Sequence, residues 1–488
     1  MSDSLKENKL YVAAKYRRKM VRDNIKGSDS IKRANTIYLR MPTGFEIESS
    51  PDYASYSGGG NNSAQFVESD LPWYHKNAAY SSYLQRARFP EIVSLARTGL
   101  IGTAIVKMPE VELPNSINYL IENAGQSKES IYEIFVELIA EVLTAGNSAL
   151  HVDVDPITNN LFINVLYAED IIDWDISNAK DELSFVNIKR IVSERSESNI
   201  FEVKNCNKNY VYKLEDEGVI VRKYVEGIEI ELSDEEGKKI EKVLSRQGIA
   251  FDRIPIFPVG SQSNSILPQP APLSGLGEIA LSIYRKDADL SNAQYMTCNP
   301  NLVISGAETG VDDNGNATGI PHIIGSQTAL VLPDPDAKAY YLKTDTSALD
   351  HMRESIKDLF EESVMYSISL IGKGKKSAES ADAINARQNA SNATLVNIVK
   401  NCGKAIRNAL EFCANNYSQS GVKFEPNLDF ADMSLSPQMI TSLTQIWMAR
   451  GLSLNTLLEI LRDAGLLPDK FDVDEELTKI NEEPPTVA

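Results

Sequence analysis

"SGLGEIALSIYRKDADLSNAQYMTC" (residues 274–298) and "SALDHMRESIKDLFEESVMYSISLI" (residues 347–371) decide the fold, because they predict two long helices of about 25 residues each on either side of a short unit. In the second stretch the apolar residues recur at helical spacing. They are Leu349, Met352, Ile356, Leu359, Ile368 and Ile371. A helix of this length spans about 37 Å at 1.5 Å per residue.

The unit between the two helices, residues 299–345, has a different pattern. "NLVISG", "TALVLP" and "AYYLK" predict three strands, and the turn-rich "DDNGNATG" separates the first two. If the flanking helices run antiparallel, this unit lies at their tip. A stalk with a cap is typical of subunits that assemble side by side.

Upstream of this stalk the sequence predicts helices followed by a β-rich region. The stretch from Lys76 to Gly102 reads as helical, and Pro90 predicts either a break or a kink in it. Residues 127–146 predict an amphipathic helix that ends at Gly146. From 149 to 232 the apolar residues alternate with period two, which predicts several short strands.

Downstream of the stalk a further helix is predicted over about 378–416, with one apolar stripe. The stripe consists of Leu395, Ile398, Cys402, Ile406, Ala409 and Cys413. The last 55 residues predict short helices and end in an acidic, proline-containing tail. Residues 50–70 are rich in Ser, Gly and Asn and predict a loop or linker.

The length of 488 residues is enough for two to four domains. The net charge is −19, but residues 1–40 alone carry 11 Lys and Arg against 4 Asp and Glu, a net of +7, which leaves −26 for the remainder. A body this acidic argues against a large nucleic-acid-gripping surface. The basic N-terminal arm is interpreted either as a solvated tail or as a contact for an acidic partner or nucleic acid.

The sequence predicts neither a membrane span nor an apolar signal core, so export is not expected. Four cysteines, Cys206, Cys298, Cys402 and Cys413, form no C-x-x-C pair. This spacing favours buried thiols in a reducing intracellular setting.

No motif predicts a catalytic, metal or cofactor site. "LIGKGKKSAESADAIN" (370–385) lacks the first glycine of a P-loop and follows a helix rather than a strand. "SGLGEIA" (274–280) follows a proline-rich loop, so it predicts a helix start rather than a dinucleotide site. "DDNGN" (312–316) lacks the glutamate and helices of a calcium loop. The four histidines fit no zinc or protease pattern. We therefore expect a protein that is not an enzyme.

The order of these segments resembles that of a tailed-bacteriophage portal protein, in the branch common in short-tailed phages and prophages. Five of the stretches that carry the resemblance are 83–114, 136–156, 271–306, 377–416 and 447–468. The resemblance extends from about residue 75 to 480. It rests on the order of many weak matches rather than on a single motif. The basic N-terminal 70 residues and "NAGQSKES" (123–130) depart from the family's pattern.

The resemblance implies an α+β portal fold with a mixed wing, a two-helix stem, a small β-containing clip and a helical C-terminal crown. The implied parts follow the chain in order. They are the N-terminal arm and first part of the wing 1–270, stem helix 271–298, clip 299–345, stem helix 346–371, tunnel loop and second part of the wing 372–430, and crown 431–488.

The same resemblance implies a ring, dodecameric in this family, at one capsid vertex of the virion, assembled in the host cytoplasm. Double-stranded DNA would pass through its channel without sequence specificity during packaging and ejection. The implied partners are the major capsid protein, the terminase large subunit and a head–tail adaptor. The alternatives are another virion protein such as a head–tail connector, or a packaging ATPase or nuclease. An enzyme of that kind needs a P-loop or a carboxylate cluster.

The basic segment at 372–380 is the candidate functional loop. By resemblance it is the portal's tunnel loop, which faces the DNA channel, and its residues are Gly372, Lys373, Gly374, Lys375 and Lys376. The glycines allow backbone freedom, and the lysines make weak, sequence-independent phosphate contacts. The alternative is an ordinary exposed loop between two helices.

Overall fold

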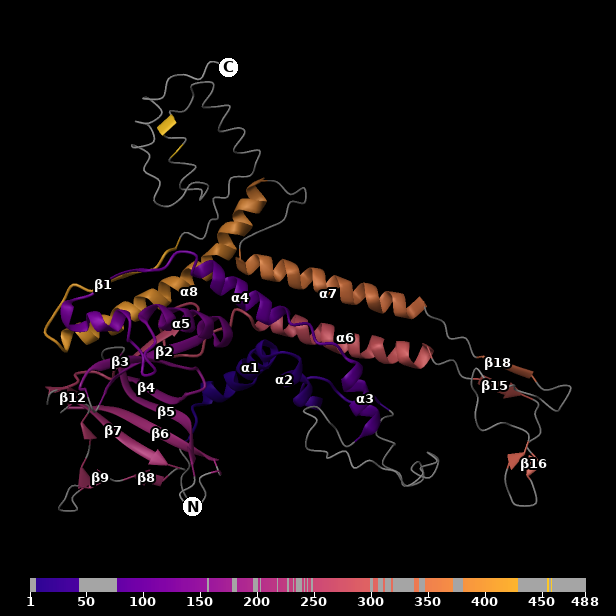
Figure 1. The fold of residues 1–488 in the computed structure, drawn as a ribbon, viewed down its shortest axis with the longest axis horizontal. Helices are drawn as coiled ribbons and strands as arrows, with labels where there is room; N and C mark the ends of the chain where they lie inside the picture. Colours follow the sequence, from indigo (N-terminus) through magenta and orange to yellow (C-terminus); the bar gives the residue numbers. More distant parts are fainter. Residues whose placement is uncertain are drawn as a thin grey trace. The chain divides into compact units, whose positions relative to one another are not determined.

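The computed structural model describes residues 6–43, 77–298 with short gaps between 156 and 248, parts of 302–341, 347–371, 381–428, and Leu454, Asn455 and Leu458. The chain divides into two compact units, Met1–Pro426 and Asn427–Ala488. All elements described below belong to the first unit (Figure 1). The predicted crown, 431–488, lies outside the described residues apart from those three, which are helical.

Helices and antiparallel strands together form the first unit, so the predicted α+β class is confirmed. Its core is a three-stranded sheet in the order β14–β2–β3, formed by Ile256–Gly260, Asn147–Val154 and Leu161–Leu166. The helices α5 (Ile131–Ala145) and α8 (Ala381–Asn415) pack against it. Phe412 of α8 lies 5.8 Å from the ring of Phe257 on β14, edge to face.

Helix α5 ends where the sequence predicts, at Gly146, but it begins at Ile131, four residues after the predicted start at 127. Ser130 accepts from the backbone N–H of Glu133, whose carboxylate in turn accepts from the N–H of Ser130, which is a complete capping box. Gly146 ends the helix at φ +84°, in the left-handed region. Pro90 separates two helices, α3 (Ala78–Arg86) and α4 (Ile92–Ala104), so a break rather than a kink is found.

A second sheet holds most of the period-two sequence. Its antiparallel order is β11–β7–β6–β5–β4, with β8 also paired to β7. The bounds are β4 Ile171–Ser177, β5 Glu182–Arg195, β6 Val203–Glu215, β7 Gly218–Val225, β8 Ile228–Ile230 and β11 Lys242–Val243. Two short pairs accompany it, β9 (Leu232–Ser233) with β10 (Lys239–Ile240) and β12 (Ser245–Arg246) with β13 (Ile249–Ala250).

The two long helices of the predicted stalk are α6 (Ser274–Cys298) and α7 (Ser347–Ile371), and they lie side by side (Figure 1). They run antiparallel: Tyr366, near the end of α7, donates to the carbonyl of Pro272 before α6, at 3.1 Å, whereas Lys286, later in α6, meets Ser355, earlier in α7. The predicted helix pair is confirmed.

Between α6 and α7 the described residues contain two short strand pairs. β15 (Leu302–Ser305) pairs antiparallel with β18 (Lys338–Tyr341), and β16 (Gly310–Val311) pairs with β17 (Ala317–Thr318). The first and third predicted strands correspond to β15 and β18. The second, 328–333, lies outside the described residues.

Two distant parts of the chain meet where β1 (Glu110–Glu112) pairs with β19 (Lys423–Glu425). Lys423 reaches Glu110 and Glu112, each at 3.2 Å. The apolar stripe predicted for α8 is fully buried, from Leu395 to Cys413. The segments before the first stem helix and after the second therefore share one core.

The N-terminal segment is folded into the body, and the prediction of a solvated tail is wrong for it. Residues 9–40 form α1 (Lys9–Lys26), α2 (Ser28–Arg33) and the short η1 (Asn35–Ile37). α1 packs against α4, α5 and α6. Its buried residues include Tyr11, Met20 and Val21. A further 3-10 helix, η3 (Asn115–Ile121), lies against α5 and α8.

Candidate functional site: the helix pair and its two charged flanks

Helix α6 lies between α1 and α7. A Cβ built on Gly277 would lie 3.3 Å from the terminal methyl of Met20 in α1, and one built on Gly275 would lie 2.7 Å from the Tyr366 hydroxyl in α7. Two residues are about 200° apart round a helix. The contacts with α1 and α7 therefore fall on nearly opposite sides of α6.

Hydrogen bonds between side chains and backbone hold α6 against the N-terminal elements. Tyr83 of α3 donates to Asp289 at 2.5 Å, and Arg285 donates to the carbonyl of Tyr38 at 2.8 Å. Burial raises the pKa of the Tyr83 hydroxyl, and the hydrogen bond to Asp289 raises it further. This side of α6 is thus rigidly attached to the body.

An open pocket of about 590 Å³ lies where α2, the end of α3 and α6 meet. We call it the basic pocket, because Lys32, Arg86 and Arg88 line it and no carboxylate does. Its polar wall also includes Ser28, Ser291 and Gln294. Arg86 donates to Asn292 at 3.0 Å, and its guanidinium lies 4.2 Å from the ring centre of Tyr295. Burial lowers the pKa of Lys32, since a buried ammonium loses hydration.

Helix α7 carries carboxylates on one side. We call Asp350, Glu354, Asp358 and Glu361 the acidic stripe, because their spacing of four, four and three residues places them on one face about 16 Å long. All four are exposed. Arg353 and Lys357 make intrahelical ion pairs with Asp350 and Glu361 at 3.0 and 3.7 Å. Such exposed pairs contribute little and leave the stripe negative.

The stripe and the basic pocket lie on opposite flanks of the helix pair. From Lys286, which faces α7, the pocket residues Ser291 and Gln294 follow by five and eight residues, or about 140° and 80° round α6. Ser355 faces α6. Measured from Ser355, the stripe residues lie about 60° to 140° round α7, counted against the direction of increasing residue number. Because the helices are antiparallel, opposite directions along the sequence correspond to the same direction of rotation in space. The rotation is measured from the side of α6 that faces α7 and from the side of α7 that faces α6, so the pocket and the stripe lie on opposite flanks of the pair.

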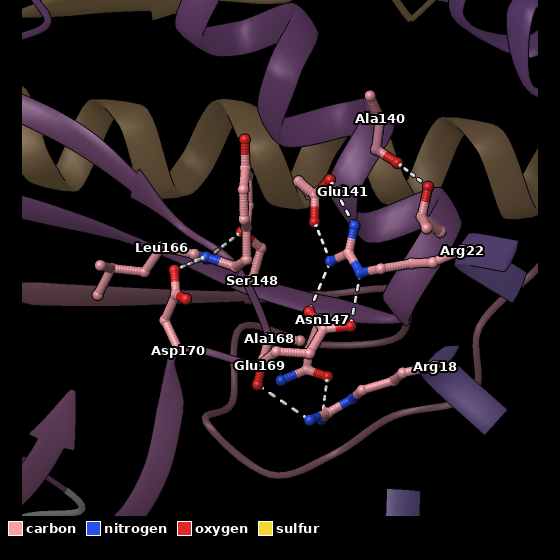
Figure 2. Close-up of polar contacts among 12 residues, drawn as sticks. Arg18, Arg22, Ala140, Glu141, Asn147, Ser148, Leu166, Ala168, Glu169 and Asp170 are labelled. Atoms are coloured by element: carbon pink, nitrogen blue, oxygen red, sulfur yellow. Dashed lines mark hydrogen bonds and ion pairs between the residues drawn. The ribbon is translucent and has the colours of Figure 1, made fainter. Parts of the chain in front are cut away.

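A buried arginine, Arg18, and a half-buried one, Arg22, attach α1 to the sheet side of the body (Figure 2). Arg18 donates to the carbonyl of Ala168 and to the side-chain oxygen of Asn147, both at 2.9 Å. Arg22 binds Glu141 through two hydrogen bonds of 3.2 and 2.6 Å, and Glu169 through two of 2.5 and 2.6 Å. We call these six residues the arginine anchor. The basic N-terminal charge is therefore neutralised in part by the chain's own carboxylates.

Burial controls the electrostatics around this anchor. Burial acts to lower the pKa of Arg22, but hydrogen bonds to Glu169 and Glu141 outweigh it and leave the pKa raised. Burial lowers the pKa of Arg18. For the neighbouring Asp170, burial raises the pKa to about 6, partly offset by the hydrogen bond from the backbone N–H of Tyr167. These contacts therefore favour the charged form of Arg22.

The loop predicted to face a DNA channel, Gly372 to Lys376, lies outside the described residues. Among the residues that the structure describes, no group of His, Cys, Asp and Glu is arranged to hold a metal. A search of the same residues finds no helix long and apolar enough to span a membrane. The sequence did not predict the basic pocket, because its cations come from positions 32, 86 and 88, whose proximity only the fold creates.

Residues 272–417, which contain α6, α7 and α8, match a family model described as a domain of unknown function, DUF4055. No curated protein matches the chain. Among solved structures, the chain is similar to one in the virion of a native gene transfer agent (GTA) particle, at 12% identity and a TM-score of 0.38, covering 77% of this chain and 90% of that one.

Two further similar chains belong to the necks of GTA particles. One is in the neck of an empty particle computed with C6 symmetry, with 13% identity, coverage of 79% and 93%, and a TM-score of 0.36. The other is in the neck of a native particle computed with C12 symmetry, with 12% identity, coverage of 77% and 90%, and a TM-score of 0.36. At TM-scores this low, the similarity establishes neither a shared fold nor a shared role.

Proposed function

We propose that this chain is the portal protein of a tailed bacteriophage or phage-like particle. The observation that carries the proposal is the antiparallel pair α6 and α7, whose chain passes through the short strands β15–β18 between one helix and the next. This is the stem-and-clip order that the sequence resemblance implies. The resemblance also covers the segments before and after the pair.

Two features of the body support the same proposal. The pairing of β1 with β19 and the burial of the α8 stripe join the segments on either side of the stem into one core, as a portal wing requires. The net charge of −19 suits a wall along which DNA slides, since repulsion between like charges prevents tight binding.

In this role the chain is a structural conduit rather than an enzyme. Identical subunits form a ring, proposed to be a dodecamer, at one capsid vertex of the virion, and assembly takes place in the host cytoplasm. Double-stranded DNA passes through the ring during packaging and ejection, driven by a separate terminase whose large subunit docks on the portal. The major capsid protein and, later, a head–tail adaptor are the other proposed partners.

Negative-stain imaging and native mass spectrometry of the purified full-length chain test this proposal. We expect rings with a central hole and a mass corresponding to twelve subunits or a neighbouring number. The outcome that overturns it is a protein that stays monomeric at every concentration tested, with or without capsid protein. A compact monomer with ATPase or nuclease activity would instead favour the enzymatic alternative.

A further inference from the structure

We infer that the acidic stripe of α7 in one copy docks into the basic pocket of the next copy. The stripe is Asp350, Glu354, Asp358 and Glu361, and the cations of the pocket are Lys32, Arg86 and Arg88. This inference rests on the proposed ring and specifies a contact that holds neighbouring subunits together.

The first argument is charge. Three cations and no carboxylate line the basic pocket, and the polar side chains of Ser28, Ser291 and Gln294 also line it. In the described part of the chain, no carboxylate makes an ion pair with any of the three, although Asp29 and Asp287 lie near enough to Lys32 to act on its pKa, in the direction that raises it. A protein with a net charge of −19 that gathers three cations around one open pocket provides a place for an anionic partner.

The second argument is position. The pocket and the stripe lie on opposite flanks of the α6–α7 pair, as their angles round the two helices show. A contact between two different surfaces of identical subunits is heterologous, and it generates a ring when the rotation closes. Opposite charges on opposite flanks are what such a contact requires, whereas a twofold dimer would need one self-complementary surface.

The third argument is the surface beside the stripe. One large apolar side chain of α7, Met365, shares the face of the stripe and is 51% exposed. Met365 continues the stripe, four residues after Glu361. Apolar area next to complementary charge is typical of a surface that a partner covers. On the pocket side, Tyr295 is 51% exposed beside Arg86.

The choice of a second copy over nucleic acid follows from the stripe itself. Duplex DNA could supply anions to the pocket, but it would be repelled by the carboxylates of α7 in every copy of the ring. A neighbouring α7 supplies four carboxylates in a fixed row, and it removes the repulsion among them when it docks. The pocket is open and lacks an enclosed cavity, which suits a helix flank better than a small ligand.

The experiment uses two full-length variants, each with one surface reversed. In the pocket variant, Lys32→Glu and Arg88→Glu make the pocket acidic. In the stripe variant, Glu354→Lys and Asp358→Lys make α7 basic. Each alone places like charges at every contact, so we expect the apparent dissociation constant for ring assembly to rise by about tenfold or more. Circular dichroism checks that each variant is folded.

Mixing the two variants gives the decisive measurement. In the mixture, the acidic pocket of one variant meets the basic stripe of the other, and the basic pocket of the second meets the acidic stripe of the first. We therefore expect alternating rings to form from two proteins that do not form rings alone, seen as mixed masses by native mass spectrometry. A control matched to the stripe variant, Glu122→Lys with Glu411→Lys, changes the net charge by the same amount at two other exposed sites and should assemble like the wild type.

The outcomes separate this inference from the proposed function. If the wild type forms rings and both variants form them equally well alone, the inference is overturned while the portal proposal stands. If the wild type forms no rings, the portal proposal fails first. If the pocket variant assembles normally but loses binding of duplex DNA or inorganic phosphate that the wild type shows, the pocket is an anion site and the docking contact is refuted.

Discussion

Arg22 and Glu141 are joined by two parallel hydrogen bonds, of 3.2 and 2.6 Å, although 119 residues separate them in the chain. Glu141 lies on the buried side of α5, with a side chain that is 7% exposed. Arg22 also donates to Glu169 through Nε and Nη2. A planar guanidinium between two carboxylates fixes the direction of α1 as well as its distance from α5.

We predict that Arg22→Met destabilises the fold by about 3 kcal/mol, because it leaves Glu141 buried without its cation. The measurement is the free energy of unfolding in urea at one protein concentration. Lys15→Met is the matched control, since Lys15 and Glu7 form an ion pair whose side chains are 55% and 31% exposed. Exposed pairs contribute about 0–1 kcal/mol. Equal losses in the two variants would contradict the anchoring role of Arg22.

A second prediction concerns Gly146, which ends α5. Its φ is +84°, and an added Cβ would lie 2.2 Å from the carbonyl oxygen of Gln269. Gly146→Ala therefore has to move the loop that leads into α6, and we expect it to lower the thermal midpoint by about 1–2 °C, the effect of about 1–2 kcal/mol in a unit of this size.

Gly102 provides the control for Gly146, because it lies inside α4 and an added Cβ meets nothing within 4 Å. Gly102→Ala should leave the thermal midpoint unchanged or raise it, since alanine favours the helix by about 0.5–1 kcal/mol. If both substitutions shift the midpoint in the same direction, the strain assigned to Gly146 is absent.

These residues also show what the sequence could and could not predict. The α8 stripe and the length of α7 follow from local periodicity, and Pro90 and Gly146 act through backbone chemistry at their own positions. The net charge of +7 in residues 1–40 allowed the interpretation as a solvated tail, because a charge count does not show what the cations contact. Arg22 binds Glu141 and Glu169, which lie 119 and 147 residues further along the chain. Arg18 and Arg22 are spaced four residues apart on α1, but their neighbours are set by tertiary packing alone.

The lysines at 373, 375 and 376 yield a third prediction, which concerns the proposed DNA path and lies outside the described residues. Changing all three to serine should leave ring assembly intact, since we place the subunit contact elsewhere, and should reduce DNA packaging or the retention of packaged DNA. Packaged DNA per particle, measured after nuclease treatment, is the readout. Packaging and retention at the wild-type level would leave these residues as an ordinary interhelical loop.

The final prediction concerns His151, which lies on β2 in the core with a buried side chain. Among the described residues, neither ring nitrogen has a hydrogen-bond partner. The ring of Tyr212 packs against it edge to face at 5.2 Å. Burial lowers the pKa of His151 to about 4, although the nearby Asp153 acts to raise it and Arg190 to lower it further. The folded protein therefore keeps this imidazole neutral.

The direction of the pH effect follows from this difference. In the unfolded chain the imidazole takes up a proton near its ordinary pKa of 6.5, whereas in the folded chain it does so only near 4. Between these values the unfolded state binds more protons, so stability is lost as the pH falls. We expect His151 to account for a loss of about 2–3 kcal/mol between pH 7 and 4.5, at 1.36 kcal/mol for each pKa unit.

His151→Leu removes the titrating group and two buried polar atoms, so the variant should lose about 2–3 kcal/mol less than the wild type over that interval. Urea unfolding at pH 7 and pH 4.5 gives both values, and carboxylates that titrate in this range cancel in the comparison. His351→Leu, on the exposed surface of α7, should keep the wild-type dependence. Equal losses of unfolding free energy between pH 7 and pH 4.5 in the wild type and in His151→Leu would contradict this prediction. They would show that the buried imidazole takes up a proton without a cost in stability.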